Sequence, residues 1–125
     1  MENNHKNSPN KRQSEDTTLI INFIKSKVEK GTGLTYEELK ESYFEEELFY
    51  VALKYVTTTK KAICTAMEIP VEAGCRYKRR YEKDGLLKQS NYDVVCPITK
   101  HFARLISTNP NEFDGLTNTN QLTLF

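Results

Sequence analysis

Apolar residues recur at helical spacing through the first half of the chain and predict a series of short helices. The first is expected to begin near Asp16 or Thr17 as N-cap and to end at Gly31 and Gly33. Thr35 followed three residues later by Glu38 is typical of a capping box, so a second helix is expected to begin there. The apolar positions that follow, up to residue 56, fit either one bent helix or two. The expected apolar stripe of the first helix consists of Leu19, Ile20, Phe23, Ile24 and Val28.

Three threonines at positions 57–59 interrupt this pattern, and a short helix over residues 60–67 is expected to follow them. Pro70 suits the start of a further helix that runs to about Asp84 and is closed by Gly85. Beyond this glycine the pattern alternates with a period of two. Two strands, roughly residues 92–96 and 102–108, are therefore expected to form a hairpin around a polar turn. The chain is predicted to be mainly α with a small β-hairpin.

The two ends of the chain differ in composition from its middle. Residues 1–15 contain no large apolar residue after Met1, so a disordered N-terminal tail is predicted. Residues 16–108 carry the periodic patterns and are predicted to form one folded domain. Residues 109–125 are rich in Asn and Thr and are predicted to form a flexible C-terminal tail.

Composition and charge restrict the classes of function. The formal net charge is only +1, so any binding of nucleic acid must be local; acidic residues gather at 37–47 and basic ones at 54–88. Three cysteines without a CxxC pair, and two histidines far apart in sequence, disfavour a zinc site and fit a reducing cytoplasm. The polar N-terminus lacks the apolar core of a signal peptide or membrane anchor. We expect a cytoplasmic protein without membrane association, metal or cofactor.

The stretch KKAICTAMEIPVEAGCRYKRRYEKDGLL, residues 60–87, combines a short apolar helix, a break and a basic helix. Together with the hairpin, it resembles a winged helix-turn-helix DNA-binding domain of three to five helices plus a wing. Two residues depart from that pattern: Glu68 replaces the turn glycine, and Gly74 stands where a branched apolar residue is usual. The positions that match inward-facing residues of the family are Ile63, Cys64, Met67, Ile69 and Tyr81.

The second helix of this motif is predicted to have two opposite faces. At 100° per residue, Tyr77 and Tyr81 share the inner face with Pro70 and Gly74, and we expect the tyrosines to fill the space that the glycine leaves. The resemblance implies that the outer face enters the major groove, where arginines reach guanine edges or phosphates. The outer face carries Glu72, Arg76, Arg79 and Lys83. Further DNA contacts are expected from Lys78, Arg80, Lys60 and Lys61, and from Lys100, His101 and Arg104 of the hairpin.

A different class of function fits the same residues. Basic residues favour helices, and this helix could pair with the acidic segment at 37–47 as a solvated face. A further alternative is a protein-interaction adaptor, in which the basic helix packs against acidic partner proteins and does not contact DNA. For the DNA-binding interpretation, the partner is double-stranded DNA and a homodimer would be usual.

The last five residues, QLTLF, resemble the short peptide by which bacterial replication and repair proteins bind the sliding clamp. That resemblance implies a glutamine at the rim of a pocket and apolar side chains inside it. The alternative is that these residues form an edge strand or fold back over the core. The residues concerned are Gln121, Leu122, Leu124 and Phe125.

Catalytic patterns are not evident in the sequence. Gly31 and Gly33 follow a helix and lack the lysine of a phosphate-binding loop, so they are interpreted as the end of that helix. We expect a non-enzymatic regulatory or replication-accessory factor of a bacterium, phage or mobile element.

Overall fold

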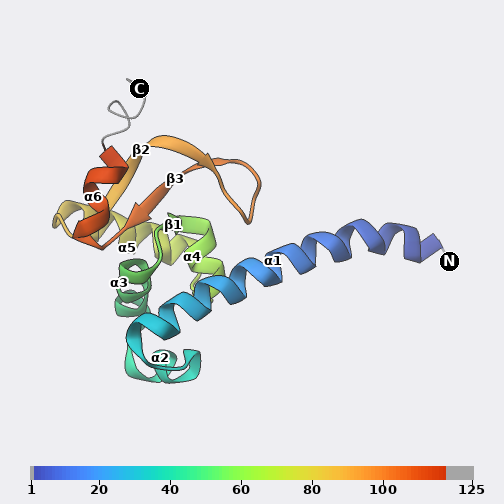
Figure 1. Cartoon of the computed structure of the whole chain (residues 1–125), viewed down its shortest axis with the longest axis horizontal. Helices are drawn as coiled ribbons and strands as arrows, with labels where there is room; N and C mark the ends of the chain where they lie inside the picture. The colour runs from blue at the N-terminus through green and yellow to red at the C-terminus, as the bar shows by residue number, and fades with distance from the viewer. Residues whose placement is uncertain (1, 118–125) are drawn as a thin grey trace.

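The computed structural model describes the backbone of residues 2–117 and the side chains of residues 16–117. Within this part the chain forms six helices and a small antiparallel sheet of three strands (Figure 1), so the predicted mainly α fold with a small β-hairpin is confirmed. The elements in chain order are α1 (Glu2–Thr32), α2 (Tyr36–Ser42), α3 (Glu45–Tyr55), β1 (Thr58–Thr59), α4 (Lys60–Met67), α5 (Val71–Lys83), β2 (Lys88–Val95), β3 (Phe102–Ser107) and α6 (Pro110–Thr117).

Side-chain caps divide the second helical stretch into two helices, α2 and α3. Thr35 Oγ1 accepts a hydrogen bond from the amide of Glu38 at 3.2 Å, and the Glu38 carboxylate accepts one from the amide of Thr35 at 2.9 Å. This is the predicted capping box. The Glu47 carboxylate in turn accepts a hydrogen bond from the amide of Phe44 at 3.1 Å, which starts α3. Of the two possibilities that the sequence left open, one bent helix or two, the structure has two helices.

The break between α4 and α5 has the geometry of a tight turn. Thr59 caps α4, its hydroxyl accepting a hydrogen bond from the amide of Ala62 at 3.3 Å. Glu68 ends α4 in the left-handed conformation, with φ 58° and ψ 45°. That conformation normally favours glycine. At this turn a glutamate thus adopts a backbone conformation that is more usual for glycine.

The Glu68 side chain is held beside this turn. Tyr36 donates a hydrogen bond from its hydroxyl to Glu68 Oε1 at 2.7 Å, and the Lys40 ammonium lies 3.8 Å from the same oxygen. The Tyr36 bond, followed by the charge of Lys40, holds the pKa of the Glu68 carboxyl below its usual value. The contact joins α2 to the turn between α4 and α5.

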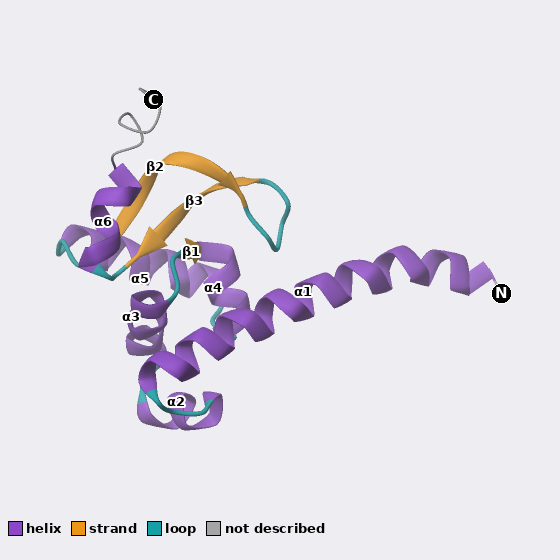
Figure 2. Ribbon diagram, viewed as in Figure 1, coloured by secondary structure: helices purple, strands orange, loops and turns teal. Residues whose placement is uncertain are grey.

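The sheet has the strand order β1-β3-β2, with both pairs antiparallel (Figure 2). The predicted hairpin is present, although β2 begins at Lys88, earlier than expected. An irregularity between Gln89 and Asp93 interrupts the ladder, and the Ser90 hydroxyl accepts the hydrogen bond of the Leu105 amide there at 3.0 Å. Strand β1 was not predicted, because two residues are too short to show an alternating pattern.

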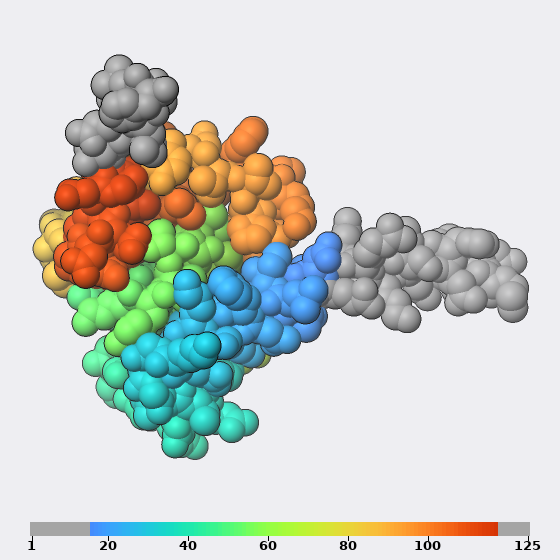
Figure 3. Space-filling model, viewed as in Figure 1, coloured from blue at the N-terminus to red at the C-terminus, as the bar shows by residue number. Residues whose placement is uncertain are grey.

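The core lies between the helices and the inner face of the sheet. The four positions predicted to point inward in residues 60–69 are all buried, which confirms that part of the interpretation: Ile63, Cys64, Met67 and Ile69. The side chains of α1 from residue 16 onward lie along the middle of the domain (Figure 3), where Ile24 and Val28 join this core. The C-terminal half of α1 is thus part of the domain and contacts α3 and α4.

The two ends of the described chain are more helical than predicted. Helix α1 begins at Glu2 and not near Asp16 or Thr17. Helix α6 occupies residues that were assigned to the C-terminal tail. Asn109 caps α6 by accepting a hydrogen bond from the amide of Asn111 at 3.0 Å, and Leu116 is buried. The side-chain amide of Asn91 also donates a hydrogen bond from Nδ2 to the carbonyl of Thr117 at 3.1 Å, which joins α6 to β2.

Candidate nucleic-acid interface

Two tyrosines fix the orientation of α5. The ring of Tyr77 lies against Phe49 with centroids 5.9 Å apart, and that of Tyr81 against Tyr50 at 5.0 Å. Tyr77 donates a hydrogen bond to Glu45 at 2.7 Å, which is the main reason why the pKa of its hydroxyl is raised. Burial raises the pKa of Tyr81 to about 12. Both tyrosines therefore lie on the inner face, as the helical spacing predicted, and the structure shows that this face meets α3.

Gly74 does not leave a space for the tyrosines, which corrects the expectation from sequence. A Cβ atom built on this glycine would lie 2.4 Å from Cys64 Sγ of α4 and 3.6 Å from Phe49. Both Gly74 and Cys64 are buried. The absence of a side chain thus allows α4 and α5 to approach closely, with the cysteine sulfur filling the contact.

The outer face of α5 carries three basic residues with exposed side chains, and Glu72 in its first turn. Tyr77 and Tyr81 pack the opposite face of the helix against α3, so the outer face points to solvent. Across residues 16–117, neither Arg76 nor Arg79 forms an ion pair with a carboxylate. Their planar guanidinium groups are therefore available to a partner. The three basic residues are Arg76, Arg79 and Lys83.

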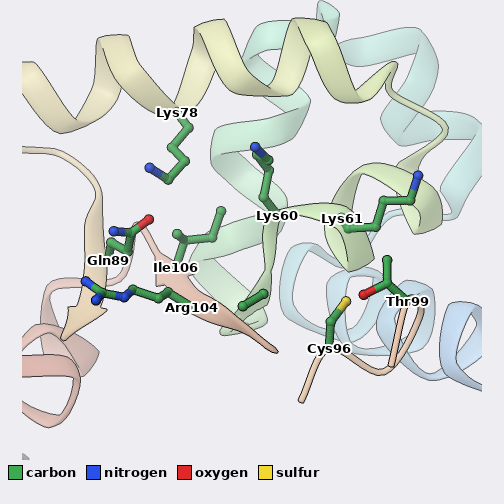
Figure 4. A pocket seen from close by; sticks show the side chains of 9 residues that line it. Lys60, Lys61, Lys78, Gln89, Cys96, Thr99, Arg104 and Ile106 are labelled. Atoms are coloured by element: carbon green, nitrogen blue, oxygen red, sulfur yellow. The ribbon is translucent and has the colours of Figure 1, made fainter. Parts of the chain in front are cut away.

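Two other basic residues of α5 lie at the edges of this face. Arg80 reaches toward α3, where its Nη1 atom lies 2.6 Å from Glu46 Oε2. From the sequence alone, the whole basic helix could form ion pairs with the acidic segment at 37–47. Such an ion pair is present at Arg80. Lys78 pairs with Glu82 of its own helix at 3.0 Å and points from α5 toward the strands (Figure 4).

A pocket of about 300 Å³ lies between α4, α5 and the hairpin (Figure 4). Four cationic side chains line this basic pocket: Lys60, Lys61, Lys78 and Arg104. Gln89 and Thr99 add polar groups to its wall. Lys60 Nζ lies 2.9 Å from the sulfur of Cys75 on α5, and Arg104 Nε lies 3.4 Å from Asp93 Oδ1. Only two of the four cations are paired with a carboxylate among the described residues, Lys78 with Glu82 and Arg104 with Asp93. The net positive charge of the pocket suits an anionic group such as a phosphate.

The turn of the hairpin presents further basic groups. Lys100 adopts the left-handed conformation with φ 65°. Its amide donates a hydrogen bond to the Cys96 carbonyl at 2.8 Å, and the Cys96 amide donates one to the His101 carbonyl at the same distance. These bonds close the turn tightly. Lys100 and His101 are both exposed at its tip.

Sequence reasoning missed part of this surface. Gln89, Thr99 and Phe102 were not named as candidates, although the first two line the basic pocket and Phe102 is exposed beside it. The alternation from residue 102 to residue 106 was a usable signal, but it does not show which strand face meets the helices. The predicted clamp-binding residues 121–125 lie outside the described residues.

Other kinds of site are less well supported. Within the described side chains, no three His, Cys, Asp or Glu residues gather where they could hold a metal ion. No helix of residues 2–117 is both long and apolar enough to cross a membrane. A second pocket, of about 340 Å³, is lined largely by apolar and aromatic side chains that include Tyr43, Tyr50 and Leu86.

Comparison with models of protein families, with curated proteins and with solved structures gave no match. A function is therefore inferred from the described residues and their geometry alone.

Proposed function

We propose that this protein is a non-enzymatic, winged helix-turn-helix protein that binds double-stranded DNA through α5. The observation that carries the proposal is the exposure of Arg76 and Arg79, without ion pairs among the described residues, on a helix whose inner face is fixed by two tyrosines. A helix of this kind fits the major groove, and the fork of an arginine matches the O6 and N7 atoms of guanine. A regulatory or replication-accessory role would suit such binding.

The basic pocket and the hairpin supply contacts of a second kind. Lys61 and Lys83 are exposed, and Lys60, Lys78 and Arg104 line or border the pocket between the helices and the strands. We assign these cations, with Lys100 at the tip of the hairpin, to backbone phosphates. Phosphate contacts contribute affinity and fix the position of the protein, while the arginines of α5 read the bases.

Salt dependence tests this division of roles. Each neutralised phosphate is expected to contribute about −0.9 to the slope of log K against log salt. Six contacts, one for each cation assigned above, then predict an affinity loss of about 2,000-fold between 50 and 200 mM salt. The measurement is fluorescence anisotropy of the full chain with a labelled duplex. Lys61→Gln is expected to make the slope less steep by about 0.9.

A matched variant controls for the loss of one charge. Lys54 is exposed on α3, with its ammonium over the ring of Tyr50 and outside the proposed interface. Lys54→Gln is therefore expected to leave the slope unchanged. A flat salt response, or no duplex binding at low salt, would instead support a protein-interaction adaptor.

We further propose that the C-terminal residues QLTLF tether the protein to a sliding clamp, on the basis of their resemblance to the clamp-binding peptide. Deleting residues 121–125 is expected to reduce affinity for a purified bacterial sliding clamp at least about tenfold, because the apolar anchors of such a peptide carry most of its binding energy. Calorimetry with the full chain and the shortened chain measures this. Asn118→Ala with Asn120→Ala serves as a control in the same tail, and equal clamp affinity before and after the deletion would end this part of the proposal.

A further inference from the structure

An exposed aromatic side chain at the start of β3 extends the proposed interface. Phe102 has 76% of its surface accessible, and its partner in the β-ladder, Val95 of β2, has 56%. Phe102 and Val95 form the apolar pair at the outer end of the hairpin. Neither was expected from sequence to take part in binding.

Strand alternation places Phe102 on the same sheet face as Arg104, one of the residues that line the basic pocket. Alternate residues of a strand share a face, so Phe102, Arg104 and Ile106 point the same way. Ile106 is buried in the core and Arg104 lines the basic pocket. As the hairpin extends beyond α4 (Figure 2), this sheet face passes from core to pocket wall to solvent. Phe102 lies about 7 Å beyond Arg104 along this face, two residues at strand spacing.

The surroundings of Phe102 favour a polyanion with flat aromatic faces. Lys100 and His101 are exposed just before it in the turn, and Arg104 follows it. The carboxylate opposite, Asp93, is already paired with Arg104 at 3.4 Å. A surface of two apolar side chains is far smaller than the roughly 800 Å² per partner of a stable protein interface. One phenyl ring does match the face of one base.

We propose that Phe102, supported by Val95, stacks on a DNA base at the edge of the interface. Stacking removes the ring from water, and the neighbouring cations hold the backbone phosphates on either side. In duplex DNA the ring would act as a wedge at a base step, as apolar side chains do in proteins that bend DNA. This inference rests on the proposed DNA-binding function and adds a residue that contacts bases from the hairpin.

Two substitutions with matched controls test it. Phe102→Ala is expected to weaken binding to a 2-aminopurine-containing duplex by about 5- to 100-fold and to abolish the rise in 2-aminopurine fluorescence that unstacking produces. Phe44, 81% exposed where α2 meets α3, is the matched control, and Phe44→Ala is expected to change neither signal. The urea midpoints of both variants are expected to stay near that of the parent, since both rings are exposed.

A second readout reports the contact directly. The chain contains no tryptophan, so Phe102→Trp introduces a single indole whose fluorescence is quenched when it stacks on a base. Phe44→Trp is expected to show no quenching. Titration with the duplex and with one of its single strands shows whether the base is paired or unpaired, and quenching by either supports the proposal.

The outcomes separate this inference from the proposed function. If Phe102→Ala behaves like Phe44→Ala while the arginines of α5 remain essential, the stacking role is wrong and DNA binding by α5 stands. If Phe102→Ala abolishes the signals but the arginines prove dispensable, stacking stands and the role of α5 is wrong. If the full chain does not bind either form of DNA at low salt, both are wrong.

Discussion

Replacing Arg76 and Arg79 together by alanine is expected to weaken duplex binding at 50 mM salt by about 30-fold or more. Each arginine that bonds a base edge contributes about 1–3 kcal/mol, so losing two costs at least about 2 kcal/mol. The free energy of unfolding is expected to change by less than about 0.5 kcal/mol, because both side chains are exposed and form no ion pair among the described residues. Fluorescence anisotropy measures the affinity and urea unfolding the stability.

Arg80 was expected from sequence to contact DNA, but it pairs with Glu46 of α3 and therefore provides the control on the same helix. Its guanidinium is paired with Glu46 at 2.6 Å, at the edge of the outer face. Arg80→Ala is expected to keep duplex affinity within about threefold of the parent and to cost at most about 1 kcal/mol of stability. Equal affinities for the double variant and the parent would remove α5 as the DNA-reading element. A loss at Arg80 as large as the loss at Arg76 and Arg79 would indicate a response to total charge and not to a specific face.

Gly74→Ala is expected to lower the free energy of unfolding by up to about 2 kcal/mol, although alanine normally favours a helix over glycine by about 1 kcal/mol. The added methyl would lie 2.4 Å from Cys64 Sγ in a fully buried contact, and overpacking of this kind costs about 1–3 kcal/mol. Urea unfolding followed by circular dichroism measures the change.

Two further variants isolate the cause. Gly115 lies in α6, where a methyl group on its Cα would have open space around it, so Gly115→Ala is expected to be neutral or stabilising by up to about 1 kcal/mol. Cys64→Ala removes the sulfur that the new methyl would meet. In the double variant, Cys64→Ala with Gly74→Ala, most of the loss should be recovered, with a coupling energy of about 1–3 kcal/mol. Stabilisation by Gly74→Ala alone would show that α4 and α5 can move apart freely.

Local signals in the sequence were reliable where a few neighbouring residues determine the structure. The capping box at Thr35 and Glu38, the cap at Thr59 and the stop at Gly85 are all found at the expected places. Each is a local contact between backbone and side chain, so it does not depend on distant parts of the chain. Strand β1 and helix α6 were missed because they are stabilised by pairing with β3 and by packing on β2.

The candidate interface divides in the same way. The outward position of its basic residues and the inward position of the tyrosines follow from the helical period of α5. Each residue is turned by about 100° from the one before it, so residues three or four positions apart lie on the same face. The sequence by itself therefore determined helices α4 and α5, the break between them and the outer arginines.

Only the tertiary structure decided which cationic side chains line the same pocket and which pair with carboxylates. Lys60 of α4 and Arg104 of β3 line one pocket, while Arg80 forms an ion pair with Glu46 of α3. The tertiary structure also showed that α4 and α5 contact each other at Gly74 and that the side chain of Phe102 is exposed to solvent. The physical reason is that these features depend on strand register and helix spacing, which are set by packing between residues far apart in the chain.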